Sequence, residues 1–197
     1  MDITFIHIPK TGGSALKKEL EKCPSIRSDI DYKLRRHQVK SSDVYNSFTI
    51  VRHPLDRFVS ASVFALRGSE KFLKYKKRVS GINDLSTFVN SLRDDKDPLH
   101  RRATNIYRMK KKNSGWTAFD PQTDWIDKYT KIICYDKNNL NANVNHFLKT
   151  HDMDCEIDLQ HVNVTKKYNF DISLSEEQIE WIQHKYKDDY TLWETHC

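Results

Sequence analysis

The sequence predicts an α/β sandwich in which helices flank a mostly parallel sheet. Short runs rich in Ile, Val, Phe and Thr alternate with segments of helical spacing, as in parallel sheets with crossover helices. Glycine is rare, with five residues in 197, yet two adjacent glycines follow the first apolar run. Hydrophobic residues make up 38% of the chain, which suffices for one globular core. We therefore expect a single domain over residues 1–197.

Each element is predicted from a local pattern. The apolar runs predict strands at 4–8, 47–51 and 131–135. Apolar residues at helical spacing predict helices at 15–20, 56–66, 85–92, 100–109 and 140–149. Ser14 and Asp84 are the expected N-caps of the first and third of these helices. The run from Ser175 to Gln178 has the form of a capping box and predicts a closing helix with Ile179, Ile182 and Tyr186 on one side.

Charge and hydropathy limit the classes of function. The net charge is +6, but residues 67–112 hold 14 Lys and Arg against 5 Asp and Glu. Such a region either attracts an anionic partner or forms a solvated face. No apolar stretch approaches the roughly 20 residues that span a bilayer, and the first residues lack the zones of a signal peptide. We expect a soluble protein without a membrane span, located in the cytoplasm (the host cytoplasm if the source is viral).

The four cysteines show no metal-binding or disulfide-scaffold spacing. Without an export signal, reduced thiols are the simplest expectation. Cys134 lies within an apolar strand and is expected to be a small buried hydrophobic residue.

The segment from Pro9 to Ser14, Pro-Lys-Thr-Gly-Gly-Ser, joins the first strand to the first helix. Glycines at such a turn let backbone N–H groups approach a ligand, and the helix N-terminus adds positive potential. This pattern favours phosphate binding, with Lys10 as a mobile charge and Thr11 as a hydroxyl donor. Because Lys10 precedes the glycines, the segment is not a Walker A loop.

A second cationic element follows the second strand. Arg52 stands where that strand ends, so its guanidinium is expected at the carboxyl edge of the sheet. Ser60 lies eight residues later, in the following helix. A guanidinium grips phosphate through two hydrogen bonds, and a hydroxyl adds another.

These two segments resemble the motifs of a known enzyme family. Residues 8–16 resemble the 5′-phosphosulfate-binding loop of sulfotransferases that use 3′-phosphoadenosine 5′-phosphosulfate (PAPS), and residues 51–62 resemble their 3′-phosphate-binding motif. The form is that of carbohydrate sulfotransferases and their bacterial or viral relatives. Residues 121–126 are similar to a P-Q-x-x-[YW] element of that family, and residues 161–165 to its H-x-N-x-[ST] segment.

The resemblance implies one sulfotransferase domain with a P-loop-like three-layer sandwich, its central, mostly parallel β-sheet flanked by helices. PAPS would be the donor and PAP (3′-phosphoadenosine 5′-phosphate) the product, with no metal. The acceptor would be a carbohydrate, possibly an anionic glycan, with no nucleic-acid partner, and the oligomeric state stays open. The 5′-phosphosulfate would be held by Lys10, Thr11, Gly12, Gly13, Ser14 and Ala15. Arg52 and Ser60 would hold the 3′-phosphate, and Asn163 and Thr165 would close the nucleotide pocket.

Sulfuryl transfer needs charge stabilisation and a base. We assign stabilisation of the departing phosphate to Lys10. His37 is the expected base, because related enzymes place a histidine before the 3′-phosphate strand and because imidazole titrates near neutrality. Asp31 is an alternative base, and His100 is a candidate for contacting the acceptor. His7 and His53 are expected to be structural, with His53 packed beneath Arg52.

Two other functions are compatible with part of the pattern. The first is a small-molecule kinase with a modified phosphate loop, which the missing Walker sequence disfavours. The second is a non-catalytic nucleic-acid-binding module built on the basic region, which leaves the two phosphate motifs unexplained. The basic segments 71–78 and 108–112 either guide an anionic acceptor or form a solvated helix face.

Overall fold

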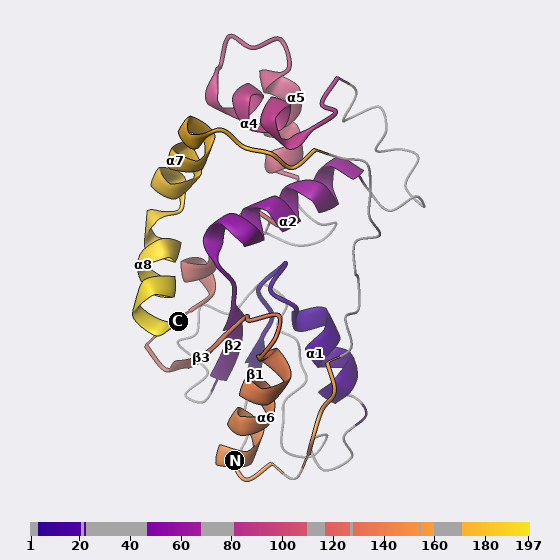
Figure 1. Ribbon diagram of the computed structural model, residues 1–197, viewed down its shortest axis with the longest axis vertical. Coiled ribbons are helices and arrows are strands. Elements are labelled where there is room, and N and C mark those ends of the chain that lie inside the picture. Colours follow the sequence, from indigo (N-terminus) through magenta and orange to yellow (C-terminus); the bar gives the residue numbers. More distant parts are fainter. Residues whose placement is uncertain are drawn as a thin grey trace.

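The computed structural model describes residues 4–20, 22, 47–67, 81–109, 117–126, 128–153, 155–159 and 171–197. Figure 1 shows a sheet with its flanking helices in one half of the molecule and a group of helices in the other. Several predicted features lie outside the described residues: Asp31, His37, the segment 71–78, residues 110–112, and Asn163 and Thr165 within the segment 161–165.

The sheet consists of three described strands in the order β1, β2, β3. They span Thr4–Ile6, Ser47–Val51 and Thr130–Cys134, close to the predicted ranges. Both pairings are parallel: Phe5 is in register with Phe48, and Val51 with Cys134. The prediction of an α/β fold with a mostly parallel sheet is confirmed, and because the strands run the same way, their carboxyl ends share one edge.

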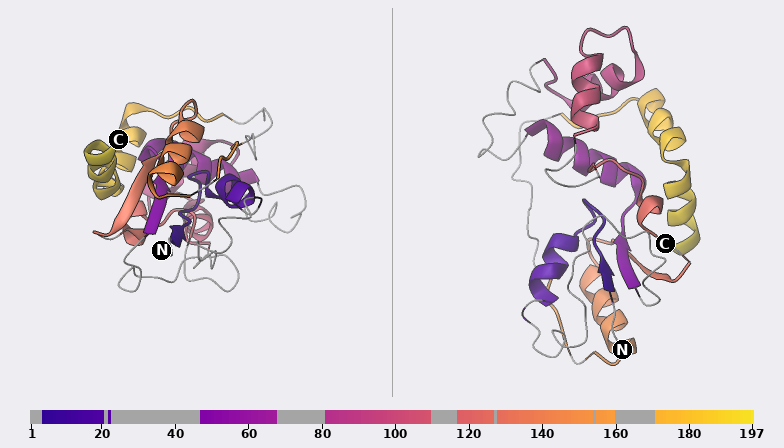
Figure 2. Two further views of the ribbon diagram at one scale, coloured as in Figure 1. Left: turned by 90° about the horizontal axis from the view of Figure 1, so that it is seen from below. Right: turned by 180° about the vertical axis from the view of Figure 1, so that it is seen from behind.

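Helices cover both faces of the sheet. On one face, Phe48 and Ile50 pack with residues of α1 (Gly13–Leu20) and α6 (Leu140–Thr150). On the other face, Val51 packs near Trp125 of η2 (Gln122–Trp125) and near Leu192 of α8 (Lys187–His196). Seen from below in Figure 2, α8 and α1 lie on opposite sides of the strands. This is the three-layer arrangement that the sequence predicts.

The second half of the molecule is helical. Helix α2 (Pro54–Arg67) crosses beyond the carboxyl ends of the strands and joins the two halves (Figure 1). Its buried residues, Phe58 among them, form a core with α4 (Leu85–Arg93), α5 (His100–Tyr107) and α7 (Glu176–Lys185). Phe119 and Tyr186 lie within that core. The sheet edge therefore faces a packed helical layer.

Two of the predicted helix caps are confirmed and one is wrong. Asp84 caps α4 by accepting a hydrogen bond from the Thr87 N–H at 2.6 Å. Ser175 and Gln178 form the full capping box of α7. Ser14, by contrast, lies inside α1, because the carbonyl of Gly12 already accepts from the N–H of Ala15 at 2.9 Å. Gly12 therefore holds the N-cap position, since the cap residue supplies the first acceptor of a helix.

The expectation of reduced thiols is also wrong. Cys134, at the end of β3, forms a disulfide with Cys197, with a Cα–Cα distance of 5.7 Å. Cys155 is disulfide-bonded as well. Cys134 is half-buried: it packs against the core cluster that contains Val51 and Trp125, and its sulfur is bonded to Cys197 after α8. Among the described helices, none has the length and apolar character needed to cross a membrane.

Candidate anion-binding site

The turn between β1 and α1 has an unusual backbone. Lys10 has φ 71° and Gly12 has φ 88°, so two residues of the turn adopt the left-handed region. Alternation between left-handed and ordinary backbone turns successive N–H groups toward one side, where they form a concave anion site. The first N–H groups of α1, those of Gly13 and Ser14, follow directly and have no acceptor within the helix. We call residues Pro9–Ser14 the anion loop.

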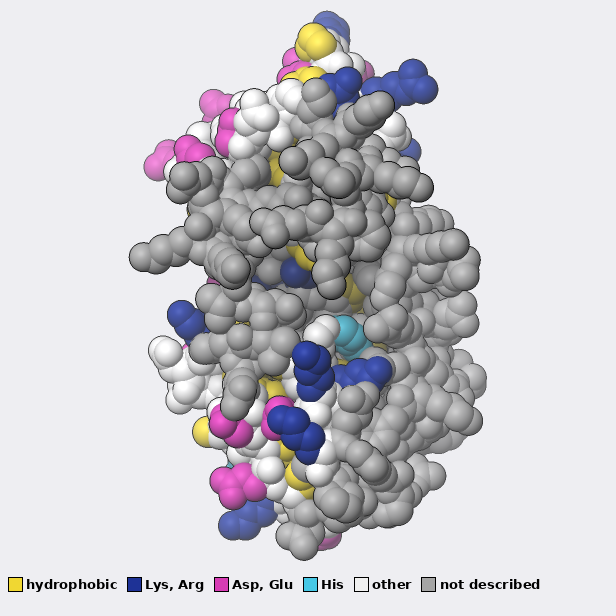
Figure 3. All heavy atoms as spheres, turned by 90° about the vertical axis from the view of Figure 1, so that its right-hand side faces the viewer, with side chains coloured by type: hydrophobic (Ala, Val, Ile, Leu, Met, Phe, Trp, Pro, Cys, Tyr) yellow, Lys and Arg dark blue, Asp and Glu magenta, His cyan; other side chains and the backbone are white. Residues whose placement is uncertain are grey.

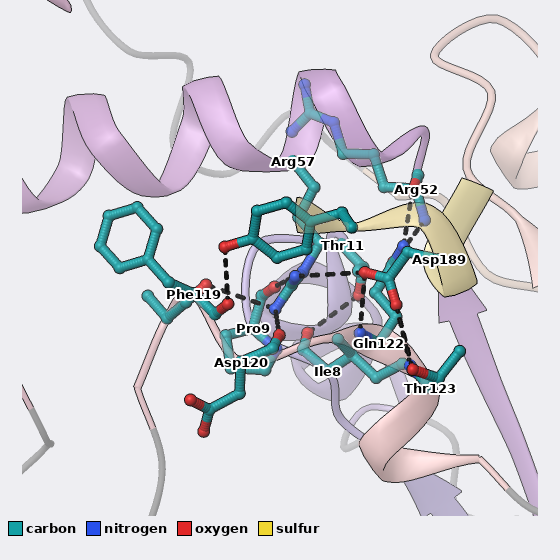
Figure 4. Close-up of polar contacts among 12 residues, drawn as sticks. Ile8, Pro9, Thr11, Arg52, Arg57, Phe119, Asp120, Gln122, Thr123 and Asp189 are labelled. Atoms are coloured by element: carbon teal, nitrogen blue, oxygen red, sulfur yellow. Dashed lines mark hydrogen bonds and ion pairs between the residues drawn. The ribbon is translucent and has the colours of Figure 1, made fainter. Parts of the chain in front are cut away.

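The carbonyl groups of this turn are held by side chains of the protein. The Thr11 hydroxyl donates to the Ile8 carbonyl at 2.9 Å. Nε of Arg57 donates to the Pro9 carbonyl at 3.0 Å, and Nη1 of Arg52 to the Lys10 carbonyl at 3.4 Å. Side chains of the protein thus donate hydrogen bonds to three consecutive backbone carbonyls of this turn, as Figure 4 shows in part. This arrangement leaves the N–H side of the loop for a ligand.

The two glycines fit where a side chain would not. A Cβ on Gly12 would lie 3.1 Å from the ring of Tyr135. A Cβ on Gly13 would overlap the ring of His7, which stacks on Phe5. His7 thus packs against the turn and Phe5, in agreement with the prediction that it is structural. Of the remaining residues of the predicted phosphosulfate site, Thr11 is buried, Ser14 is exposed and Ala15 is half-buried.

Lys10 is placed to neutralise a bound anion. Its Nζ lies 4.5 Å from the centroid of the Phe64 ring, on α2. Burial of the ammonium, with repulsion from Arg52, lowers the pKa of Lys10 to about 8. A cation in such a poorly solvated place gains more from an anionic ligand than an exposed one does. Lys10, which the sequence analysis assigned to the site, therefore has a lower pKa than an ordinary lysine.

Arg52 is fixed at its backbone and loosely held at its guanidinium. Gln122 clamps the Arg52 backbone, because its Oε1 accepts from the N–H at 2.9 Å and its Nε2 donates to the carbonyl at 2.9 Å. The guanidinium carbon lies 4.9 Å from the centroid of the Tyr135 ring. Its buried Nε has no hydrogen-bond partner within the described part of the chain. A buried N–H without a partner is costly, so this atom points to an absent acceptor.

Ser60 lies on the same side of α2 as the groups that touch the anion loop. Arg57 precedes it by three residues and Phe64 follows by four, and both contact the loop. Residues at this spacing share one face of a helix. Ser60 is half-buried between them. The structure thus brings Lys10 and Arg52 into contact and places Ser60 on the face of α2 that carries Arg57 and Phe64.

Two further histidines that the sequence analysis considered, His53 and His100, have contacts within the fold. His53 packs edge-on against the rings of Tyr190 and Trp193 of α8. Nδ1 of His100 lies 2.8 Å from the Ser91 carbonyl, and its Nε2 lies 3.3 Å from the Thr104 hydroxyl. The prediction that His53 is structural agrees with these contacts, although its neighbours belong to the C-terminal helix. His100 joins α4 to α5, away from the anion loop.

Sequence reasoning assigned no role to three residues that hold the site together: Arg57, Gln122 and Asp189. Arg57 interrupts the apolar face of α2, which is a detectable signal, because a charge on such a face needs a partner. Gln122 belongs to the element at 121–126 that was noted for its resemblance. Asp189 follows another aspartate on α8, and nothing in the sequence distinguishes the two.

Positive side chains gather near this part of the surface. Figure 3, which looks onto the side of the molecule where α1 lies, shows described Lys and Arg side chains close together near the middle, next to a histidine. Helix α1 itself carries Lys17 and Lys18. The arrangement as a whole can bind a multiply charged anion through backbone N–H groups, one lysine and one guanidinium.

Comparisons with protein-family models, curated proteins and solved structures found no match to the chain.

Proposed function

We propose that the protein is a sulfotransferase that moves the sulfuryl group of PAPS to a hydroxyl or amine of an acceptor, in our hypothesis a carbohydrate. One observation carries the proposal. The guanidinium of Arg52 donates to the carbonyl of Lys10, so the two motifs expected to hold the two ends of one nucleotide are in contact. One motif offers N–H groups at a helix start, and the other offers a buried guanidinium nitrogen that has no hydrogen-bond partner among the described residues.

The residues of the anion loop suit the phosphosulfate end of the donor. Backbone N–H groups from Gly12 to Ser14 would hold the phosphosulfate oxygens, with the side chains of Lys10, Thr11 and Ser14 beside them, while the N–H of Ala15 is engaged with the Gly12 carbonyl. Thr11 would act through the loop conformation, because its hydroxyl is engaged with Ile8. Arg52 and Ser60 would hold the 3′-phosphate. Asn163 and Thr165 stay proposals for closing the nucleotide pocket.

The chemical step needs a leaving group and a base. PAPS supplies a sulfuryl group attached to a phosphate oxygen. The acceptor oxygen or nitrogen forms the bond to sulfur while the bond from sulfur to that phosphate oxygen breaks, and the oxygen keeps the electron pair. Lys10 would stabilise the charge that develops there, in a poorly solvated place where electrostatic effects are strong. His37 remains the proposed base that takes the acceptor proton.

The disulfides bear on where this reaction would take place. Disulfide bonds persist in oxidising compartments and are rare in the reducing cytosol. The bond between Cys134 and Cys197 therefore weighs against the cytoplasmic location that the sequence predicts. We propose that the protein works in an oxidising compartment or outside the cell.

Calorimetry with PAP tests the nucleotide assignment directly. We expect saturable binding of PAP without added metal and weaker binding of adenosine 5′-phosphate, which lacks the 3′-phosphate. Incubation with labelled PAPS and a panel of glycans should then show which acceptor gains a sulfo group. No heat with PAP at millimolar concentration would refute the assignment. Turnover of ATP with Mg²⁺ in the same preparation would favour the kinase alternative.

A further inference from the structure

A buried ion pair lies behind the candidate site. Arg57 of α2 and Asp189 of α8 have side-chain exposures of 3% and 0%, and their Nη1 and Oδ2 atoms are 3.9 Å apart. Taking two charges out of water costs more than such a long ion pair returns unless further hydrogen bonds satisfy both groups. Burial accordingly raises the pKa of Asp189 and lowers that of Arg57. The pair needs an explanation other than stability alone.

Arg57 connects this pair to the anion loop. Its Nε donates to the carbonyl of Pro9, the residue before Lys10 with its left-handed backbone. Its Nη2 donates to the carbonyls of Ala118 at 3.3 Å and Asp120 at 2.7 Å. The guanidinium is therefore fixed on several sides, and it holds the loop in place through one of those bonds.

Asp189 connects the same pair to the Arg52 side. Its Oδ2 accepts from the N–H of Gln122 at 2.9 Å, and its Oδ1 accepts from the N–H of Thr123 at 3.1 Å and from the Thr123 hydroxyl at 3.3 Å. These contacts fix η2, and the side chain of Gln122 then clamps the backbone of Arg52. Figure 4 shows these contacts converging between the helices and the strand end.

The Asp189 carboxylate is thus connected to the anion loop through Arg57 and to Arg52 through Gln122. We propose that Asp189 and Arg57 are positioning residues that set the separation between the anion loop and the Arg52 guanidinium. The C-terminal helix is then part of the nucleotide site, although it contributes no group to the ligand. This inference rests on the proposed function, because it assumes a ligand that touches both halves.

The inference predicts how the preference for PAP over adenosine 5′-phosphate changes in variants. A ligand held at both ends depends on the separation of the two anion sites, whereas a ligand held at one end does not. Asp189→Asn should therefore weaken PAP binding about tenfold or more, since small misplacements are costly, while binding of adenosine 5′-phosphate changes little. A merely structural role would lower the fraction of folded protein and reduce both affinities by the same factor.

A neighbouring residue supplies the matched control. Asp188 is exposed on the same helix, so Asp188→Asn removes an equal charge and should leave both affinities unchanged. Gln122→Met offers a milder second variant, because it removes the clamp on Arg52 and leaves the ion pair intact. It should also reduce the preference for PAP over adenosine 5′-phosphate. If Asp189→Asn does not fold by circular dichroism, Arg57→Lys decides, because it keeps the charge but loses the fork that binds the Pro9, Ala118 and Asp120 carbonyls: an unchanged preference for PAP in a folded Arg57→Lys protein overturns the inference.

The outcomes separate this inference from the proposed function. An unchanged preference for PAP in a folded Asp189→Asn protein overturns the inference and leaves the sulfotransferase proposal standing. If the natural protein binds neither nucleotide, the proposed function fails, and amide hydrogen exchange in the free protein decides the inference. Faster exchange in Asp189→Asn at both residues 9–14 and residues 51–53 would then support a positioning role. Unchanged exchange at either segment would overturn it.

Discussion

The anion loop and the end of β2 at Arg52 hold their functional groups by different means. In the loop the backbone itself is specified, through the left-handed residues Lys10 and Gly12 and through side chains that bind three consecutive carbonyls. At Arg52 the backbone is clamped by Gln122, but the guanidinium rests on the ring of Tyr135 and on one long hydrogen bond. The difference indicates that the anion loop is preorganised and that the Arg52 guanidinium is adaptable.

The two regions also depend on different parts of the chain. The hydrogen bonds that hold the loop come from Thr11 within it, from Arg52 after β2 and from Arg57 on α2. Arg52 depends on Gln122, 70 residues later, and through it on Asp189 of the C-terminal helix. Because Asp189 also reaches the loop through Arg57, a change at Asp189 should affect both sides, whereas a change at the end of α8 that spares the ion pair should affect the Arg52 side first.

The largest expected effect is on turnover in Lys10→Ala. If Lys10 stabilises the departing phosphate, its loss should lower kcat about 10²–10³-fold, as the loss of a transition-state donor does in other enzymes. Binding of PAP should fall by less. The measurement is kcat for sulfuryl transfer beside the Kd for PAP. Equal losses in both would mean that Lys10 only binds, and Lys18→Ala on the exposed side of α1 is the control.

The second prediction concerns the tether behind Arg52. Cys134 and Cys197 join the end of β3 to the end of α8, on the side that supports Arg52. Cys197→Ser should lower the free energy of unfolding by about 2–4 kcal/mol, which is typical for the loss of a disulfide. Chemical denaturation measures it. Cys134→Ser should cost the same, and the double variant no more than either single variant, because all three remove one bond.

Amide hydrogen exchange would show which segments of the molecule are destabilised by the loss of the disulfide. In Cys197→Ser, amides of η2 and of the end of β2 should exchange faster than those of the anion loop. The opposite order would contradict the division of the site into a local half and a half that depends on the C-terminus.

A smaller effect is expected from Gly12→Ala. An alanine at φ 88° is strained by roughly 1–2 kcal/mol, and its Cβ would press on the Tyr135 ring beneath Arg52. Gly81 has the same φ and a Cβ position 3.1 Å from Leu99, far from the site in sequence. Gly81→Ala should lose similar stability in thermal unfolding but keep its affinity for PAP. An equal loss of affinity in both variants would remove the special role of the turn.

Local patterns predicted the elements because local forces decide them. The strand of residues 47–51 agrees with β2 at both ends, and the caps at Asp84 and Ser175 form the expected hydrogen bonds. The cap at Ser14 was wrong because Gly12 takes that position. The separate helix α8 was not predicted, since the break at Tyr186 leaves no proline or glycine in the sequence.

Sequence analysis could predict only those residues of the candidate site that are proposed to contact a ligand. Glycines at a turn and an arginine at a strand end leave a local signature, and the structure brings Lys10 and Arg52 together. Of the supporting residues, only Arg57 leaves a signal, as a charge on the apolar face of α2, whereas Gln122 and Asp189 leave none because they bind backbone groups, which every sequence contains. The pairing of Cys134 with Cys197 was missed for the same reason, since it depends on where a distant helix packs.

The smallest expected effect is a pH dependence that tests whether the two cations share a site. Burial first, and Arg52 second, lower the pKa of Lys10 to about 8, so its charge is lost as the pH rises through that value. A bound anion favours the charged form, so PAP affinity should fall by up to tenfold between pH 8 and 9. The phosphates titrate near pH 6 and do not contribute there. Calorimetry at pH 7, 8 and 9 measures the fall.

Two variants decide which group is responsible. Lys10→Arg stays charged over this range and should bind PAP equally well from pH 7 to 9. Arg52→Ala removes the repulsion between the two cations, so the fall in the remaining affinity should move to higher pH. A fall of the same size and position in all three proteins would assign the titration to another group. In that case the contact between Lys10 and Arg52 would not couple the two halves of the site electrostatically.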